Sequence, residues 1–240
     1  MANPFTSLAE QYASEEAQNR YRVARNEAQR KLLLENPAVN VDPVLAGTEQ
    51  DKRMACCVVS RPDNPTKELI LLIQNKLQNS VSTEIWLTPP ENLHMTILEV
   101  AHSRPEKEIE SLVHVLKPKM EAINSIAAEG PVLKHPLLCY DANALALSFT
   151  SSNPTHTKLR ETLYDFATRN GVDILPRYAG PSAHITIARF KQPLSAEDVN
   201  HMLETIASIN NFMPNHEWKI TSASLSSGLI WYGQQGTMFQ

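Results

Sequence analysis

The chain has 240 residues, a formal net charge of −4, and 42% hydrophobic against 20% charged residues, a balance typical of a globular protein. No apolar run approaches the roughly 18 residues that a membrane-spanning helix needs, and the first residues lack the basic segment and apolar run of a secretory signal. The three cysteines are too few for a disulfide framework or a zinc site, which favours buried thiols in a reducing compartment. We therefore expect a cytoplasmic protein without a membrane partner, with a nuclear location left open.

Residues 1–50 are predicted to form an N-terminal helical extension and a connector. Residues 7–35 are rich in Ala, Glu, Gln, Leu and Arg, which favour helix, and Pro37 and Pro43 interrupt this pattern. Arg and Lys alternate there with Glu, which indicates a solvated helix face. Proteins that bind long nucleic acids instead gather their cations into a stripe. The charge pattern therefore argues against a long duplex as partner and leaves room for a small anionic substrate or a strand end.

From residue 54 onward the sequence contains the same order of elements twice, which indicates an internal repeat. The first copy is predicted as strand 54–60, a helix opening at Asn64-Pro65, strand 92–100, a helix from 103 to about 123, and a strand near 136–140. The second copy is predicted as strand 144–150, a helix restarting at Asn153-Pro154, strand 183–188, a helix opened by Ser195, and closing strands at 218–224 and 228–232 that would pair as a hairpin.

The two copies also match in spacing. The Asn-Pro pair precedes a histidine by 30 residues in the first copy, from Asn64 to His94, and by 31 residues in the second, from Asn153 to His184. A matching order at a matching offset predicts an α+β fold built from a duplicated β-α-β-α-β unit. The corresponding boundaries are 51–240 for the domain, and about 54–140 and 141–240 for its two lobes.

Each copy carries a His-x-Thr motif on the equivalent strand. The motifs are His94-Met-Thr96 and His184-Ile-Thr186. Successive side chains of a strand point to opposite faces, so each His and Thr should share one face while their apolar neighbours point to the core. If the two units pack about a pseudo-two-fold axis, the two polar faces meet in one cleft.

Two imidazoles and two hydroxyls in a cleft suit displacement at phosphorus. The reaction needs a base to activate the nucleophile and an acid to protonate the leaving oxygen, and histidine serves both roles because its pKa lies near 6.5. The hydroxyls can donate to the non-bridging oxygens as charge develops. These residues therefore predict His94, Thr96, His184 and Thr186 as catalytic residues of a reaction that needs neither metal nor cofactor.

Two stretches resemble the 2H phosphoesterases, a family that includes RNA ligase-like and cyclic nucleotide phosphodiesterase enzymes. They are Thr88-Pro-Pro-Glu-Asn-Leu-His-Met-Thr-Ile97 and Gly180-Pro-Ser-Ala-His-Ile-Thr-Ile-Ala-Arg-Phe190. The resemblance covers about residues 54–235 and implies a two-lobed fold whose antiparallel sheets face a central cleft, with the same four catalytic positions. It also implies hydrolysis of a nucleoside or RNA-terminal 2′,3′-cyclic phosphate to a phosphomonoester, with the 2′-phosphate as the favoured product. By the same resemblance, His184 is favoured as the base and His94 as the acid.

Tyr178 stands six residues before His184 and is a candidate substrate-binding residue that would stack on a base or hydrogen-bond to phosphate. Loop packing is its other interpretation, and surface salt bridges are favoured over phosphate binding for Arg177 and Arg189. The same four catalytic residues would equally serve a phosphodiesterase or ligase acting on 2′,5′-linked or 3′-terminal oligonucleotides. A non-catalytic nucleotide-binding module is a further alternative. A metal hydrolase is disfavoured because the sequence has no His-x-x-x-His, no Cys pair at metal-ligand spacing and no His-Asp dyad. We expect the chain to act as a monomer.

Overall fold

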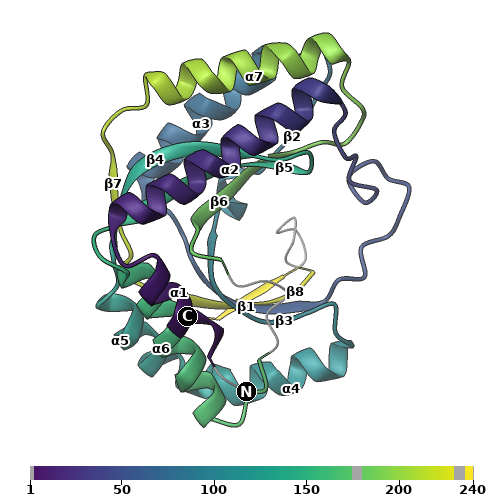
Figure 1. The fold of residues 1–240 in the computed structure, drawn as a ribbon. Helices are drawn as coiled ribbons and strands as arrows, with labels where there is room; N and C mark the ends of the chain where they lie inside the picture. Colours follow the sequence, from purple (N-terminus) through teal and green to yellow (C-terminus); the bar gives the residue numbers. More distant parts are fainter. Residues whose placement is uncertain (1–2, 175–179, 230–235, 240) are drawn as a thin grey trace.

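The computed structural model describes residues 3–174, 180–229 and 236–239, which form a mixed α+β fold around one open antiparallel sheet (Figure 1). Within these residues the strand order is β7-β4-β5-β6-β3-β1-β8-β9, and β2 pairs with β6. The strands are β1 (Ala55–Ser60), β2 (Trp86–Leu87), β3 (Met95–His102), β4 (Val132–Tyr140), β5 (Ala144–Ser151), β6 (Ala183–Arg189), β7 (Glu217–Lys219), β8 (Ser224–Gly228) and β9 (Thr237–Phe239). In these ranges no helix combines the length and the apolar character that a membrane crossing requires.

Helices contact the sheet, and the first helices of the chain form the N-terminal segment. They are α1 (Pro4–Gln11), α2 (Glu15–Glu35), α3 (Asn64–Asn79), α4 (Glu106–Leu116), α5 (Met120–Ala128), α6 (Thr155–Arg169) and α7 (Ala196–Asn211), with 3₁₀ turns η1 (Pro90–Asn92) and η2 (Lys117–Lys119). Helices α3 and α7 contact the β4–β5–β6 half of the sheet, and α4, α5 and α6 contact the β3–β1–β8 half. Figure 1 shows these two halves above and below the junction of β3 and β6.

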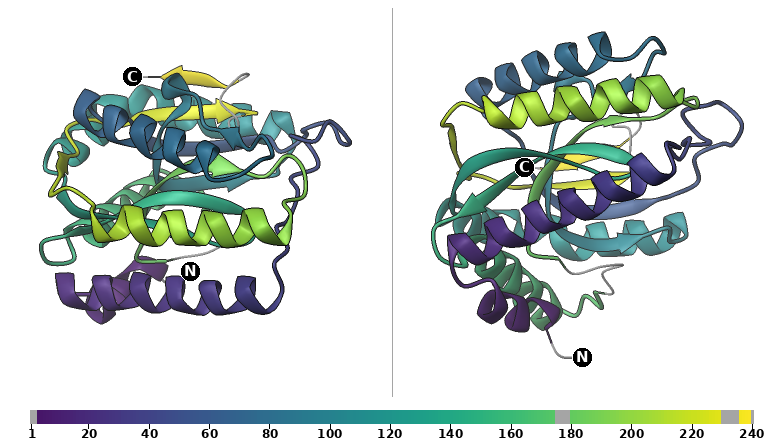
Figure 2. Two further views of the ribbon diagram at one scale, coloured as in Figure 1. Left: turned by 90° about the horizontal axis from the view of Figure 1, so that it is seen from above. Right: turned by 45° about the horizontal axis from the view of Figure 1, so that its top comes forward.

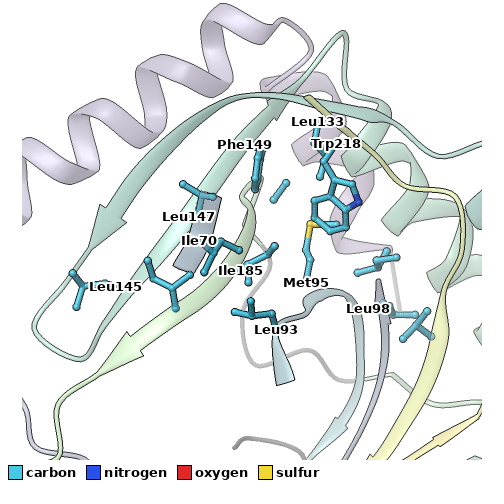
Figure 3. Packing of buried hydrophobic residues seen from close by; sticks show 14 of the residues in the cluster. Ile70, Leu93, Met95, Leu98, Leu133, Leu145, Leu147, Phe149, Ile185 and Trp218 are labelled. Atoms are coloured by element: carbon cyan, nitrogen blue, oxygen red, sulfur yellow. The ribbon is translucent and has the colours of Figure 1, made fainter. Parts of the chain in front are cut away.

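One face of the sheet supplies most of the hydrophobic core. In β5, Leu145, Leu147 and Phe149 lie on this face and are almost fully buried, because alternate side chains of a strand share a face. Phe149 packs edge-on against Trp218 with ring centroids 5.9 Å apart, and Figure 3 shows both among core side chains of the neighbouring strands. Burying an aliphatic or aromatic side chain of this size stabilises the fold by roughly 1.5–3 kcal/mol, so this face fixes how the strands lie.

Several predicted boundaries are corrected by the structure. The predicted helix from 103 to about 123 is interrupted by η2, because Pro118 has no N–H to continue the hydrogen-bond ladder. The predicted helix at 7–35 is two helices, and the Ser14 hydroxyl accepts from the N–H of Ala17 as the N-cap of the second. By contrast, the predicted start of a helix at Ser195 is confirmed, since its hydroxyl caps α7.

The two closing strands do not form the predicted hairpin. Strand β7 pairs with β4 at one edge of the sheet, whereas β8 pairs with β1 and β9 in the other half. Residues 220–223 between them are not in a strand. The predicted strand at 228–232 lies mostly outside the described residues.

When the short strands β2 and β7 are left aside, the third strand of each sequence unit pairs with the other unit. Strand β4, from the first copy, pairs with β5 of the second, and β8, from the second copy, pairs with β1 of the first. Helices cross over as well, because α3 follows β1 but contacts β6, and α6 follows β5 but contacts β3. The sequence lobes at about 54–140 and 141–240 therefore exchange strands and helices in space.

The N-terminal segment packs on the body of the protein. Helix α1 lies against α6, where Phe5 is fully buried and the guanidinium of Arg160 sits 4.2 Å from its ring centroid. Helix α2 contacts β4 and β5, and the right view of Figure 2 shows α2 running beside these strands. The prediction of a solvated cationic face is wrong at Arg22, which is only 6% exposed and donates from Nη1 to the carbonyl of Ser148 at 3.0 Å.

Candidate functional site

The two His-x-Thr motifs meet at the centre of the sheet. Strands β3 and β6 run antiparallel and pair at Met95 and Ile185, the middle residues of the two motifs. In an antiparallel pair the residues on either side of such a pair also stand opposite each other. His94 is therefore opposite Thr186, and Thr96 is opposite His184, about a local two-fold axis.

The four motif side chains share one face of the sheet. Met95 and Ile185 are fully buried in the core, whereas the His and Thr residues on either side of each are partly exposed. This difference follows from the alternation of side chains along a strand. We call the sheet surface that carries His94, Thr96, His184 and Thr186 the His/Thr face.

Both imidazoles are held through Nδ1 by the residue two positions earlier. Nδ1 of His94 lies 2.7 Å from the carbonyl oxygen of Asn92, and Nδ1 of His184 lies 3.2 Å from Oγ of Ser182. A carbonyl oxygen only accepts, so Nδ1 of His94 carries the proton and donates it. In the neutral ring Nε2 then has the free lone pair, ready to exchange a proton with a ligand.

An arginine lies beside His94. The side chain of Arg61 donates from Nη1 to the carbonyl of Glu91 and, at 3.5 Å, to that of Leu93, so it is tied to the segment that leads into the motif. A pocket on this side is lined by Val59, Arg61, Asn92, His94, Ser226 and Met238. The side chains that line this pocket include an imidazole, a hydroxyl and a guanidinium, which together can bind an anion.

A second arginine joins the two motif strands from behind. Nε of Arg160, on α6, donates to the carbonyl of Ile97 at 2.9 Å, and Nη1 donates to the carbonyl of Gly180 at 2.5 Å. Ile97 follows Thr96 on β3, and Gly180 lies just before β6. Arg160, which is 8% exposed, therefore fixes the two strands relative to each other beyond the point where they pair.

Both motif histidines are harder to protonate than a free imidazole. Burial lowers the pKa of His94 and the charge of Arg61 acts in the same direction, while the hydrogen bond to Asn92 opposes them. Burial, followed by the charge of Arg160, lowers the pKa of His184 to about 4, with Arg25 and His94 adding to this and the Ser182 backbone opposing it. At neutral pH both rings are neutral, and a bound anion would raise both pKa values.

A third histidine lies behind the site. His156, at the start of α6, is 2% exposed, and neither ring nitrogen has a hydrogen-bond partner among the described residues. Burial lowers the pKa of His156 to about 3, with the charges of Arg160 and His184 acting in the same direction. At neutral pH His156 is therefore neutral.

The other predicted site residues are not at this centre. Tyr178 and Arg177 lie outside the described residues. Arg189 is at the far end of β6, where it stands opposite Trp86 and Ala144. Within the part of the chain that the structure describes, no three His, Cys, Asp or Glu side chains gather into a set that could hold a metal ion.

Sequence reasoning missed the arginines around the site. Arg61 follows the first strand of the repeat directly and its proximity to His94 depends on the pairing of β1 with β3, which no local pattern reports. Arg160 lies in the middle of an amphipathic helix, where a surface position is the ordinary expectation. A scan of the chain against models of known protein families finds no match, and a search of curated proteins finds no relative.

Proposed function

We propose that this protein is a two-histidine phosphodiesterase that opens a nucleoside or RNA-terminal 2′,3′-cyclic phosphate. The observation that carries the proposal is the two-fold arrangement of His94, Thr96, His184 and Thr186 on one partly exposed face. Few side-chain sets other than two imidazoles supply both an acid and a base near neutral pH. The hydrolysis needs neither a cofactor nor a metal, and the protein acts as an intracellular monomer.

In the proposed reaction His184 is the base and His94 the acid. Nε2 of His184 takes a proton from water as the water oxygen bonds to phosphorus. The P–O3′ bond breaks, and protonated Nε2 of His94 delivers a proton to O3′, which leaves a 2′-phosphate. His184 suits the base because the pKa is lowered to about 4, so its ring is neutral in the free enzyme.

The hydroxyls and the arginine supply electrostatic stabilisation. Thr96 and Thr186 are placed to donate to the two non-bridging oxygens, whose charge must be held as the transition state forms. The charge of Arg61 in the pocket beside His94 would add to this. The negative charge of the substrate also raises the pKa of His94, which lets it bind the proton that it later donates.

The strand order supports a duplicated 2H phosphoesterase fold. Counted outward from the junction, one half of the sheet runs β6, β5, β4, β7 and the other β3, β1, β8, β9. When the short strands β2 and β7 are left aside, each half thus begins with the second strand of a unit, continues with its first strand, and adds the third strand of the other unit. A two-fold arrangement with exchanged third strands is what duplication of the unit would give.

The proposal is tested by incubating the purified protein, in a chelator, with the four nucleoside 2′,3′-cyclic phosphates and locating the phosphate of each product by ³¹P NMR. We expect a 2′-phosphate from at least one substrate, and its formation should be about 10²- to 10⁴-fold slower with a His94→Ala variant. In parallel, 2′,5′-linked and 3′-terminal oligonucleotides are assayed. Activity on these alone would show that they, and not 2′,3′-cyclic phosphates, are the substrates. Binding without turnover of any of these would indicate a nucleotide-binding module and contradict the proposal.

A further inference from the structure

Helix α2 covers the same sheet face that carries the two histidines. Ser148 of β5 stands opposite His184 on β6, so their side chains share the His/Thr face. Asn26 of α2 donates from Nδ2 to the carbonyl of Leu138 on β4 at 2.9 Å. Arg22, one turn earlier in α2, binds the carbonyl of Ser148. The N-terminal segment therefore forms a wall beside His184.

Arg25 of α2 is a cation beside His184, and an ion pair with Asp141 fixes its position. Its Nη2 lies 3.2 Å from Oδ2 of Asp141, whose Oδ1 accepts from the backbone N–H groups of Asn143 at 2.8 Å and Ala144 at 3.1 Å. Asp141 is thus fixed in the turn between β4 and β5 and orients the guanidinium. A guanidinium has five N–H donors, and the Arg25 side chain is 51% exposed, so it can bind a ligand as well.

The residue of β5 beside Thr186 is small. Ala146 stands opposite Thr186 and is partly exposed, so a methyl group borders the His/Thr face on its β5 side. The charge of Arg25 acts across this surface on His184, whose pKa it helps to lower after burial and Arg160. Neighbouring strands are about 4.8 Å apart. A phosphate bound between Thr96 and Thr186 on β3 and β6 would therefore not also reach α2, which packs on β4 and β5.

We propose that Arg25 binds the phosphodiester that precedes the terminal nucleotide, so that the substrate is the 3′ end of an RNA strand and not a free cyclic mononucleotide. This inference rests on the proposed function. A ligand that engages both the His/Thr face and Arg25 needs a second anionic group at a distance from the first, and a nucleotide chain carries one on every residue. One cation on a chain with a net charge of −4 suits a strand end better than a long duplex.

The test compares two substrates with the same terminal base, a nucleoside 2′,3′-cyclic phosphate and a short oligoribonucleotide ending in that group. The full-length chain is used because Phe5 is part of the core. Arg25→Gln should lower kcat/KM for the oligonucleotide by roughly tenfold or more, mainly through KM, since a hydrogen-bonded charge is lost. Its kcat/KM for the mononucleotide, measured at pH 7, should stay within about twofold. Burial is the largest cause of the low His184 pKa of about 4, so the base stays neutral at pH 7 without Arg25, and the lost ion pair is an exposed one.

The matched control is Arg20→Gln on the same helix, where the Arg20 side chain is 69% exposed and pairs with Glu16. This variant should leave kcat/KM unchanged for both substrates. Equal losses on both substrates, or no loss on the oligonucleotide, would overturn the inference.

A binding measurement separates this inference from the proposed function. Fluorescence anisotropy of a labelled oligoribonucleotide ending in a 3′-phosphate gives the affinity as a function of salt, without turnover. Arg25→Gln should reduce the slope of log K against log salt by about 0.7, the value for one phosphate contact with a single strand. If the wild-type protein hydrolyses neither substrate but binding still depends on Arg25, the function fails and the inference stands. If hydrolysis proceeds and the slope is unchanged, the inference fails and the function stands.

Discussion

The two motif strands have the same backbone arrangement but different surroundings. His94 on the β3 side has Arg61 and a pocket bordered by Ser226 and Met238. His184 on the β6 side has Arg160 behind it, and helix α2 with Arg25 beside it. The pKa of His94 is lowered, and that of His184 is lowered to about 4. A duplicated unit thus supplies two equal groups in different electrostatic surroundings. After burial, Arg61 acts on His94, whereas Arg160 and Arg25 act on His184.

Part of this asymmetry comes from outside the repeat. Helix α2 precedes the first copy in the chain, yet it packs on strands β4 and β5 next to His184. The described residues include no comparable helix on the His94 side of the His/Thr face. Added segments of this kind can make two related sites differ without changing the motif itself.

The largest expected effects come from removing either imidazole. His94→Ala and His184→Ala should each lower kcat by about 10²- to 10⁴-fold, the usual contribution of a general acid or base. Circular dichroism should show that both variants remain folded, since the two rings are partly exposed. If one variant kept most of its activity, the two halves would not share the reaction and the two-histidine mechanism would be wrong.

The two threonines should show a smaller and nearly equal loss. Thr96→Ala and Thr186→Ala each remove one donor to the phosphate, which costs on the order of 10- to 10³-fold in kcat. Thr96→Ser and Thr186→Ser keep the hydroxyl and should restore much of the rate. Loss of activity from only one of the two Ala variants would show that the substrate contacts one half of the site only.

The burial of His156, which lies near His184, can be tested through the pH dependence of the free energy of unfolding. Its folded pKa is about 3, below the unfolded value, so the unfolded chain binds more protons as the pH falls below about 6.5. The stability that a neutral His156 allows is present above pH 6.5 and is lost as the pH falls toward 3. At pH 5 this costs roughly 2 kcal/mol.

His156→Leu removes this titration. Urea unfolding at pH 8 and pH 5 should show the stability of the variant rising relative to wild type by about 2 kcal/mol on going to the lower pH. His184 contributes to both proteins, so its effect cancels to first order. A difference that is the same at both pH values would contradict the burial of a neutral His156.

The sequence predicts the repeat, the motif strands and the start of α7, because these depend on short-range patterns of apolar residues and caps. It does not predict the exchange of β4 and β8, since strand partners are chosen by packing between distant segments. The break between α4 and α5 could be predicted from Pro118, although the predicted helix from 103 to about 123 ran across it. Arg22 and Arg160 were unpredictable as buried residues, because their burial depends on hydrogen bonds to the carbonyls of Ser148 and Ile97, which are distant in the sequence.

The smallest expected effect concerns the pH dependence of kcat/KM. The reactive form has one proton between His94 and His184, so kcat/KM should be bell-shaped with limbs that belong to the pair. Because kcat/KM reports the free enzyme, its acid limb should lie near 4, the pKa of His184, and its alkaline limb below the ordinary histidine value of about 6.5. A profile that rises once and stays flat from about pH 5 to pH 9 would indicate a single ionisation.

Arg61→Gln should move only one of these limbs. Arg61 is among the causes that lower the pKa of His94, and it is not among those acting on His184. Removing its positive charge favours the imidazolium of His94, so the alkaline limb should move to higher pH while the acid limb stays in place. Arg104→Gln, which removes an exposed arginine paired with Glu108, is the control and should leave both limbs unchanged. Movement of the acid limb in Arg61→Gln would exchange the assignment, making His94 the base and His184 the acid.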